Sequence, residues 1–311
     1  MRRKRVKFLG LWLAAALWAG VASDAFAAQV TYKFASVDGI RVFYREAGDP
    51  QKPTILLLHG FPSSSHMFRD LIPELEERFH IIAPDYPGMG NSEAPPAATF
   101  TATFDSVASV MEKFVQTIGA RKAILYMQDF GGPIGMRLAT RRPDWVRGVI
   151  IQNIPVTLDG WEPSRLAAVQ ASVGPESLAK RKAAESRVAL ATALFLYRHG
   201  AHNPDGLNPD AWTSDAFALT NPESRRVMTD LQLDIPSNLS LYGEWQDYLR
   251  TRQPKTLVVW GDGDPIFVPR GADAIRDFVP GAEIRHYNTG HFALEEEHSD
   301  IARQIIRVFG E

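Results

Sequence analysis

The sequence predicts an α/β protein: a mostly parallel sheet of eight strands, with helices on both faces and an inserted helical cap. Two observations predict this class. First, apolar runs of strand length alternate with stretches of helical period, which is typical of a parallel sheet covered by helices. Second, the alternation stops after Pro155 and resumes only at Thr256, so a long segment is inserted between two strands.

The strands are expected where short runs are apolar or β-branched and end at turn residues. Residues 30–34 and 40–45 form an opening pair, separated by a turn signal at residues 38–39. Residues 54–59 are a nearly continuous apolar run, as expected for a fully buried strand. Further runs of this kind predict central strands at residues 81–83, 123–128, 146–151, 256–260 and 283–287.

Helices are expected where apolar residues recur at helical period. Outside the inserted segment these stretches are residues 68–77, 104–117, 133–140, 273–278 and 301–309. Residues 155–253 are rich in helix-forming and charged residues, and a structureless loop of that length would be uncommon in a compact domain. We therefore interpret them as the cap and assign residues 28–154 and 254–311 to the sheet domain. Turn signals in residues 203–209 leave a surface loop as the alternative for the middle of the cap.

Residues 1–27 have the pattern of a secretory signal peptide. Basic residues precede a short apolar run, and small residues flank a cleavage point after Ala27. The run is shorter than the roughly 20 residues that a membrane span needs, although an uncleaved anchor is the alternative. Cleavage would remove five basic residues and one acidic residue and change the net charge from −2 to −6. We therefore expect a periplasmic or secreted protein, without stable membrane insertion after cleavage.

The composition excludes several kinds of site. The chain has no Cys, which excludes a disulfide scaffold, a thiol nucleophile and a zinc–cysteine site. Its 34 Lys and Arg residues nearly balance 36 Asp and Glu residues, so it lacks the basic field of a nucleic-acid-binding protein. The eight His residues are scattered, and no Gly-rich segment has the spacing of a phosphate loop. Neither a metal nor a cofactor is expected.

A sharp turn from strand to helix is expected around Asp129. The strand at residues 123–128 is followed by Asp129 and Phe130, then by Gly131 and Gly132, and Pro133 opens a helix. Glycines supply the small neighbours that such a turn needs, and Pro at the first helical position loses no useful hydrogen bond. The turn would place the carboxylate above the carboxyl ends of the strands, at a helix N-terminus that favours negative charge. Helix capping is the alternative role for this Asp.

Three further motifs follow predicted strands. Residues 59–62, His-Gly-Phe-Pro, follow the third strand, and the amides of Phe61 and Phe130 are the natural donors to an oxyanion at this turn. Asp264 and then His291 follow the last two strands, so a nucleophile, an acid and a base occur in this order along the chain. A single loop Asp is usually solvated and a single His is usually structural, but their joint order favours a catalytic set.

With these motifs the chain resembles the α/β-hydrolase superfamily, and within it the aspartate-nucleophile branch of epoxide hydrolases and haloalkane dehalogenases. The resemblance covers about residues 30–311 and includes a Gly-rich loop at residues 85–92. It implies an α/β-hydrolase fold, with Asp129 as nucleophile, Asp264 as acid and His291 as base.

The acid has two other candidate positions. In some relatives it follows the sixth strand, where this chain has Asn153, which cannot supply a carboxylate. Asp262 is flanked by two glycines and is interpreted as a turn residue, so Asp264 is preferred.

An Asp nucleophile narrows the reaction. Because a carboxylate is ionised at neutral pH, it needs no base before it attacks, and the His is free for a second step. We expect Asp129 to displace a leaving group at a saturated carbon, and His291 to activate water against the resulting ester. This chemistry argues against ester, lipid or peptide hydrolysis by acyl transfer.

The leaving group is predicted to be an epoxide oxygen. The dehalogenases that the chain resembles supply N–H donors to a halide, including a Trp directly after the nucleophile, where this chain has Phe130. Epoxide hydrolases use cap tyrosines instead, but one usual position matches Ile235, so Tyr197 and Tyr242 are the nearest substitutes and Tyr248 is a third. The cap also contains tryptophans that keep a haloalkane or haloacid dehalogenase open as the alternative: Trp161, Trp212 and Trp245.

The sequence therefore predicts a cofactor-independent hydrolase whose partners are a small apolar organic substrate and water. A hydrolase-fold protein that binds a small molecule without catalysis is the alternative from another class, and the complete catalytic set argues against it. No oligomeric state is predicted.

Overall fold

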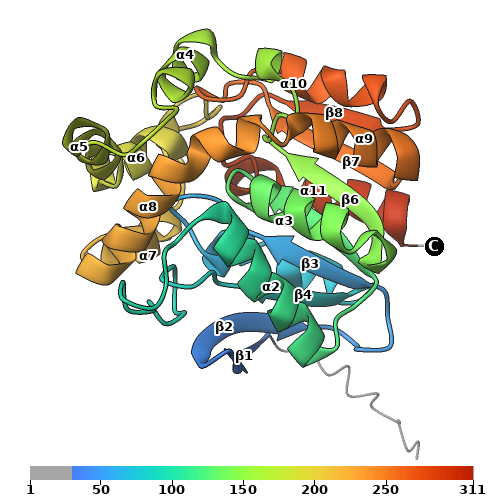
Figure 1. Ribbon diagram of the computed structural model, residues 1–311. Coiled ribbons are helices and arrows are strands. Elements are labelled where there is room, and N and C mark those ends of the chain that lie inside the picture. Colours follow the sequence, from blue (N-terminus) through green and yellow to red (C-terminus); the bar gives the residue numbers. More distant parts are fainter. Residues whose placement is uncertain (1–29, 311) are drawn as a thin grey trace, which may run out of the picture.

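The computed structural model of the chain describes residues 30–310. At its centre is an 8-stranded sheet with the order β1-β2-β4-β3-β5-β6-β7-β8 (Figure 1). Strand β2 pairs antiparallel with both β1 and β4, and all the other pairs are parallel. The strands are β1 (Thr31–Val37), β2 (Ile40–Ala47), β3 (Thr54–Leu58), β4 (His80–Pro84), β5 (Ala123–Gln128), β6 (Val146–Gln152), β7 (Lys255–Gly261) and β8 (Glu283–Tyr287). The prediction of a mostly parallel eight-stranded sheet is confirmed.

Helices cover both faces of this sheet, as the sequence predicts. On one face α2 (Phe104–Ile118) packs against α3 (Gly131–Arg141), and α3 packs against α9 (Tyr242–Arg252) (Figure 1). On the other face α1 (Ile72–Leu75) contacts α11 (Leu294–Phe309), which also contacts β7. Strands β4 and β5 are buried along their whole length, so the apolar core lies between the two helical layers and the sheet.

Three predicted helices differ in extent from those in the structure. Residues 68–77 are not one helix but a 3-10 turn, η1 (Ser65–Phe68), followed by α1, because Pro73 lies in the first turn of α1 and cannot extend a helix from the preceding residues. Residues 273–278 are likewise divided between α10 (Arg270–Asp273) and η4 (Ala274–Asp277). The last helix begins at Leu294 and not at residue 301. Its first turn is acidic, which suits a helix N-terminus. Because that turn has no apolar residues at helical period, the sequence pattern does not show it.

The segment between β6 and β7 is helical. A 3-10 turn, η2 (Pro143–Trp145), precedes β6. After β6 come a second 3-10 turn, η3 (Leu158–Gly160), and five helices, which are followed by α9 and β7: α4 (Pro163–Ala171), α5 (Leu178–Arg187), α6 (Leu190–Arg198), α7 (Asp210–Ala218) and α8 (Pro222–Leu239). Helices α4 and α5 both pack on α8, and α6 packs on α7. These helices lie together at the end of the sheet toward which the β6 arrow points (Figure 1). The turn signals of residues 203–209 lie in the connection between α6 and α7.

The predicted signal peptide and its cleavage point after Ala27 lie outside the described residues. Within residues 30–310, no helix has the length and hydropathy that crossing a bilayer requires.

Candidate active site

Asp129 lies in the sharp turn between β5 and α3. Its φ of 47° is in the left-handed region, which non-glycine residues rarely adopt and which is typical of functional sites. The turn brings the next residues against the adjacent strand: a Cβ at Gly131 would lie 2.1 Å from the Leu58 carbonyl oxygen. Only glycine fits there, so the glycine signal in the sequence has a steric cause. The helix begins at Gly131, before the predicted Pro133.

The Asp129 carboxylate faces both an amide and an imidazole. The Phe61 amide donates to Asp129 Oδ1 at 2.8 Å, and His291 Nε2 lies 3.8 Å from Asp129 Oδ2. Burial raises the pKa of Asp129, while the charge of His291 and the amides of Phe61 and Phe130 counteract this rise. The carboxylate is thus largely shielded from water, with 10% of its side chain exposed, held at one oxygen by an amide, and close at the other oxygen to a base.

His291 follows β8 and is fully buried. Its Nδ1 lies 2.7 Å from Asp264 Oδ2, and neither side chain is exposed. Burial opposes the charged form of His291, but the carboxylates of Asp264 and Asp129 outweigh that effect and raise its pKa above the ordinary value. Because Nδ1 is engaged by Asp264, Nε2 is the nitrogen that is directed toward the nucleophile.

Asp264 is fixed by hydrogen bonds to both of its oxygens. The amides of Ile266 and Phe267 donate to Oδ1 at 2.8 and 3.2 Å. Asn153 Nδ2 donates to Oδ2 at 2.9 Å, and Asn153 Oδ1 accepts from the Gly261 amide at 3.0 Å. The position after β6 that lacks a carboxylate therefore holds the acid in place from the neighbouring strand.

The weaker acid candidate lies elsewhere. Asp262 contacts His286 Nδ1 at 2.7 Å and is 43% exposed at its side chain, so it is part of the surface and does not reach His291. The structure brings Asp129, Asp264 and His291 together and leaves Asp262 outside.

Sequence reasoning missed the contacts of two polar residues beside this set: it considered Asn153 only as a position without a carboxylate, and it did not consider Gln128. Gln128 is fully buried, and its Nε2 lies 3.1 Å from His291 Nε2. Gln128 ends the buried strand β5, and Asn153 follows the buried strand β6. An amide side chain at the end of an apolar strand was the feature of the sequence that could have indicated a role in the site. Their contacts depend on the pairing of β5, β6 and β7, which a single sequence does not display.

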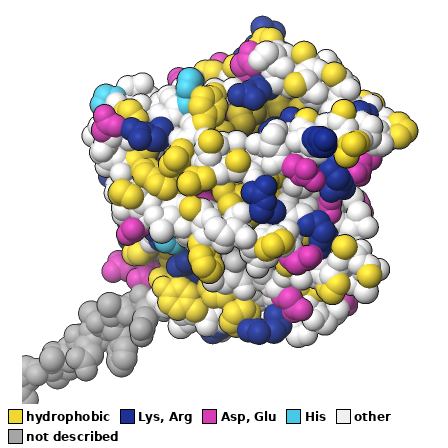
Figure 2. Space-filling view, turned by 90° about the vertical axis from the view of Figure 1, so that its left-hand side faces the viewer, with side chains coloured by type: hydrophobic (Ala, Val, Ile, Leu, Met, Phe, Trp, Pro, Cys, Tyr) yellow, Lys and Arg dark blue, Asp and Glu magenta, His cyan; other side chains and the backbone are white. Residues whose placement is uncertain are grey.

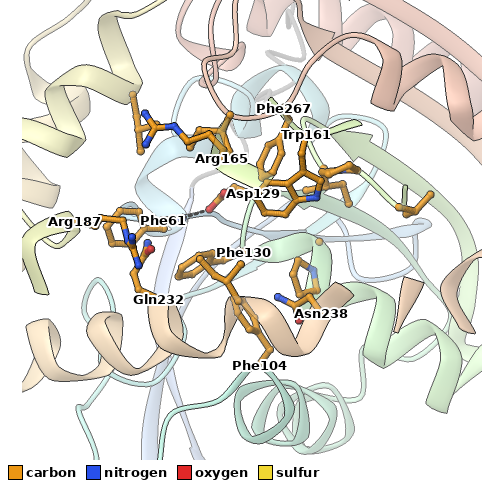
Figure 3. Close-up of a pocket in the computed structure, with 18 of the residues that line it drawn as sticks. Phe61, Phe104, Asp129, Phe130, Trp161, Arg165, Arg187, Gln232, Asn238 and Phe267 are labelled. Carbon is orange, nitrogen blue, oxygen red and sulfur yellow. Dashed lines mark hydrogen bonds between the residues drawn. The ribbon is translucent and has the colours of Figure 1, made fainter. Parts of the chain in front are cut away.

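A cavity of about 350 Å³ opens in front of Asp129 (Figure 3). Its wall is mainly apolar and comes from the sheet domain and the cap helices. Phe61 and Phe130 flank the nucleophile, with their ring centroids 5.4 Å apart. On the cap side the wall includes Trp161, Tyr242 and Trp245, together with Ile235.

The two tyrosine candidates have different places. Tyr242 lines the cavity, and its oxygen accepts a hydrogen bond from Trp161 Nε1 at 2.7 Å. The Tyr197 hydroxyl donates to Asp215 at 2.7 Å, and its ring stacks on Phe292 at 4.0 Å. Tyr197 is not among the lining residues, because this buried contact directs its hydroxyl away from the cavity. The third candidate, Tyr248, is not a lining residue either.

The same test separates the cap tryptophans. Trp161 and Trp245 line the cavity, whereas Trp212 does not. Trp245 Nε1 is buried and has no hydrogen-bond partner among residues 30–310. In that same part of the chain, no group of three His, Asp or Glu side chains is arranged to hold a metal ion.

Known proteins share the sequence pattern and the fold of this chain. Residues 53–298 match the family model described as alpha/beta hydrolase fold. An uncharacterized hydrolase of Saccharomyces cerevisiae is 36% identical over 285 residues, which cover 90% of this chain and 97% of the relative. Haloalkane dehalogenase 2 of Mycobacterium tuberculosis is 30% identical over 279 residues, which cover 87% of this chain and 92% of that protein.

Among solved structures, the haloalkane dehalogenase DbeA from Bradyrhizobium elkani has the same fold. It aligns with a TM-score of 0.74 at 22% identity, over 89% of this chain and 96% of that one. Because the family model spans most of the chain and relatives match it from end to end of their own length, the chain belongs to the α/β-hydrolase superfamily, in the branch of haloalkane dehalogenase-like and epoxide hydrolase-like enzymes.

Proposed function

We propose that this hydrolase opens epoxides to diols through an ester on Asp129. One observation carries the proposal: the groups around the nucleophile suit an oxygen leaving group. Phe61 and Phe130, the side chains that flank Asp129, contain no N–H that could hold a halide, while Tyr242, which carries a hydroxyl, lines the same cavity.

In the first step an oxygen of Asp129 attacks a carbon of the epoxide ring. Oδ1 is held by the Phe61 amide, so Oδ2 is the oxygen that is free to form the new bond. The ring C–O bond breaks, and the departing oxygen takes a proton from a nearby hydroxyl. The products are an alkyl ester of Asp129 and a neutral alcohol on the neighbouring carbon.

Tyr242 is the donor that the cavity offers for this proton. Its oxygen already accepts from Trp161, and within residues 30–310 no acceptor lies within hydrogen-bond distance of its own proton. Burial raises the pKa of Tyr242, so its hydroxyl stays protonated at neutral pH, while the Trp161 hydrogen bond partly opposes that rise. After the transfer, water from solvent returns the proton to the phenolate.

In the second step His291 takes a proton from water, and the hydroxide attacks the ester carbonyl carbon of Asp129. The amides of Phe61 and Phe130 are placed to hold the oxyanion that forms. Collapse of this intermediate breaks the bond between the Asp129 carbonyl carbon and the ester oxygen, which leaves as part of the diol and takes the proton from His291. The restored carboxyl group contains the oxygen of the water and releases its proton to solvent, which leaves the Asp129 carboxylate.

The direct test is to stop the reaction after its first step. His291→Gln removes the base but leaves Asp129 intact, so an epoxide should convert the variant into a stable covalent adduct. Intact-mass spectrometry of the protein after incubation with a panel of epoxides, followed by peptide mapping, should place the added mass on Asp129. His298→Gln is the matched control, because His298 contacts Glu74 on the surface and lies outside the cavity.

The control should turn over epoxide and accumulate no adduct. Failure of His291→Gln to gain mass with any epoxide, under conditions in which the wild-type protein forms diol, would contradict a covalent mechanism.

A second prediction concerns the proton donor. Tyr242→Phe removes only the hydroxyl and should lower the rate of epoxide opening by about 10²- to 10⁴-fold, the range expected for loss of a general acid. Single-turnover adduct formation in the His291→Gln background measures this step directly. Tyr248→Phe, which also removes a partly buried hydroxyl but does not face the cavity, should react at the unaltered rate. Equal rates for the two variants would remove Tyr242 from the mechanism.

Dehalogenation is the second candidate, and one observation favours it. Trp245 lines the cavity, its buried Nε1 has no hydrogen-bond partner within residues 30–310, and an indole N–H can hold a departing halide. Several relatives also carry the name haloalkane dehalogenase. The adduct experiment separates the two functions: haloalkanes would label Asp129 and release halide, while epoxides would not.

A further inference from the structure

The cavity wall contains two arginines far from the nucleophile in sequence. Arg165 belongs to α4, and Arg187 ends α5. Within residues 30–310, neither guanidinium has a carboxylate within ion-pair distance. Two other cap arginines do: Arg181 pairs with Asp230 at 3.1 Å, and Arg226 pairs with Glu223 at 2.9 Å. The two cavity arginines therefore lack the carboxylate partners that these arginines have.

The acidic residue nearest to Arg165 in the sequence, Glu162, already accepts hydrogen bonds from backbone amides. Glu162 accepts from the amides of Ser164 and Arg165 at 3.1 and 3.0 Å, so it caps the N-terminus of α4. The Arg165 side chain, although exposed to solvent on one side, lines the cavity on the other.

Arg187 is the more enclosed of the two. Its Nε is buried and has no hydrogen-bond partner among residues 30–310. Arg165 and Arg187 line the same cavity (Figure 3), and burial, together with the charge of Arg165, lowers the pKa of Arg187. A buried cationic donor without a partner is costly, and native proteins usually satisfy it. This arrangement is expected where an anion completes the site.

A third donor lies on the same side. Gln232 of α8 is only 8% exposed, lines the cavity, and makes no side-chain hydrogen bond within residues 30–310. In Figure 3, Arg187 and Gln232 lie on one side of Asp129, and Trp161 and Phe267 lie on the other. Seen from the cap side, basic and hydrophobic side chains also lie next to one another on the surface (Figure 2).

We infer that Arg165, Arg187 and Gln232 form a carboxylate-binding subsite, and that the substrate is an epoxide whose apolar chain ends in a carboxylate. This inference rests on the proposed function. The planar fork of a guanidinium matches the two oxygens of a carboxylate, and the Gln232 amide adds an N–H donor. Apolar side chains, including Leu196 and Ile235, line the cavity and suit a hydrocarbon spacer.

Binding of an unreactive acid tests the subsite without any chemistry. Isothermal titration calorimetry should show that octanoate binds the wild-type protein about ten- to a hundredfold more tightly than octanamide, as expected for charge-assisted hydrogen bonds. Arg187→Met, which keeps the aliphatic length, should remove this preference. Lys182→Met is the matched control on the same helix, because Lys182 is exposed and outside the cavity, and it should retain the preference.

A second variant covers the case in which Arg187→Met does not fold. Arg165 is exposed, so Arg165→Met should fold, and it should weaken octanoate binding without changing octanamide binding. Equal binding of octanoate and octanamide by the wild-type protein would overturn the inference. Tighter binding of octyl phosphate than of octanoate would overturn the assignment to a carboxylate.

Turnover connects the subsite to the reaction. For a terminal epoxide with a carboxylate at the other end, kcat/KM should exceed that of its methyl ester by a similar factor, and Arg187→Met should equalise the two. Equal kcat/KM in the wild-type protein would refute the inference and leave epoxide hydrolysis standing. Selective octanoate binding without turnover of either epoxide would refute the proposed function and support the anion subsite.

Discussion

Asp129→Asn is expected to abolish diol formation, with a loss of about 10⁴-fold or more, because the amide cannot form the ester on which both steps depend. Asn is the suitable replacement, since it has nearly the same shape and tolerates the left-handed φ of 47° at this turn. Diol formation measured by gas chromatography, together with the absence of a mass adduct, checks the prediction.

Asp262→Asn is the matched control for this change. Asp262 also lies just past the end of a strand, but it contacts His286 at the surface, so its loss should leave activity unchanged. Circular dichroism of both variants shows whether the fold is intact. Diol formation by folded Asp129→Asn at a rate near that of the wild type would mean that water attacks the epoxide directly.

Asp264→Asn is expected to arrest the second step. In a catalytic triad, replacing the orienting Asp by Asn lowers kcat by about 10⁴-fold. Here the loss should fall on ester hydrolysis, because attack by Asp129 does not need His291. Epoxide should therefore label the variant in an initial burst, and the adduct should then decay slowly. Stopped-flow mixing followed by intact-mass measurement separates these two phases.

The pH dependence gives this prediction a second readout. The base must be neutral to accept a proton from water, so turnover is lost as the pH falls through the pKa of His291. Asp264 helps to raise that pKa, so removing its charge should shift the acid limb of the residual activity to lower pH. An unshifted limb would show that Asp264 does not act through His291.

Most of the fold could be predicted from the sequence because strands buried on both faces leave a clear signal. Each run that was expected to be a strand corresponds to a strand of the sheet, and Asp129, Asp264 and His291 follow β5, β7 and β8 in that order. The first residues of the helices were harder to predict from the sequence. The acidic first turn of α11 stabilises its N-terminus but has no apolar period, so the sequence places its start too late.

The candidate donor residues on the cap side of the cavity could not be ranked from the sequence, because their spacing does not show where each side chain points. The sequence did not distinguish Tyr197 from Tyr242 as donors, and only tertiary contacts separate them: the Tyr197 hydroxyl donates to Asp215, whereas Tyr242 lines the cavity. The role of Arg187 could not be predicted from the sequence either, since an arginine at the C-terminus of a helix usually interacts with the helix dipole or with solvent.

The hydrogen bond between Asn153 and Asp264 joins side chains that follow two neighbouring strands. Both side chains meet at Asp264 Oδ2, the atom that contacts His291. An exchange of the two residues would keep one carboxylate and one amide, with unchanged total charge, at the same junction. The double exchange of Asn153→Asp with Asp264→Asn should therefore retain more activity than Asp264→Asn alone, which the rate of diol formation measures.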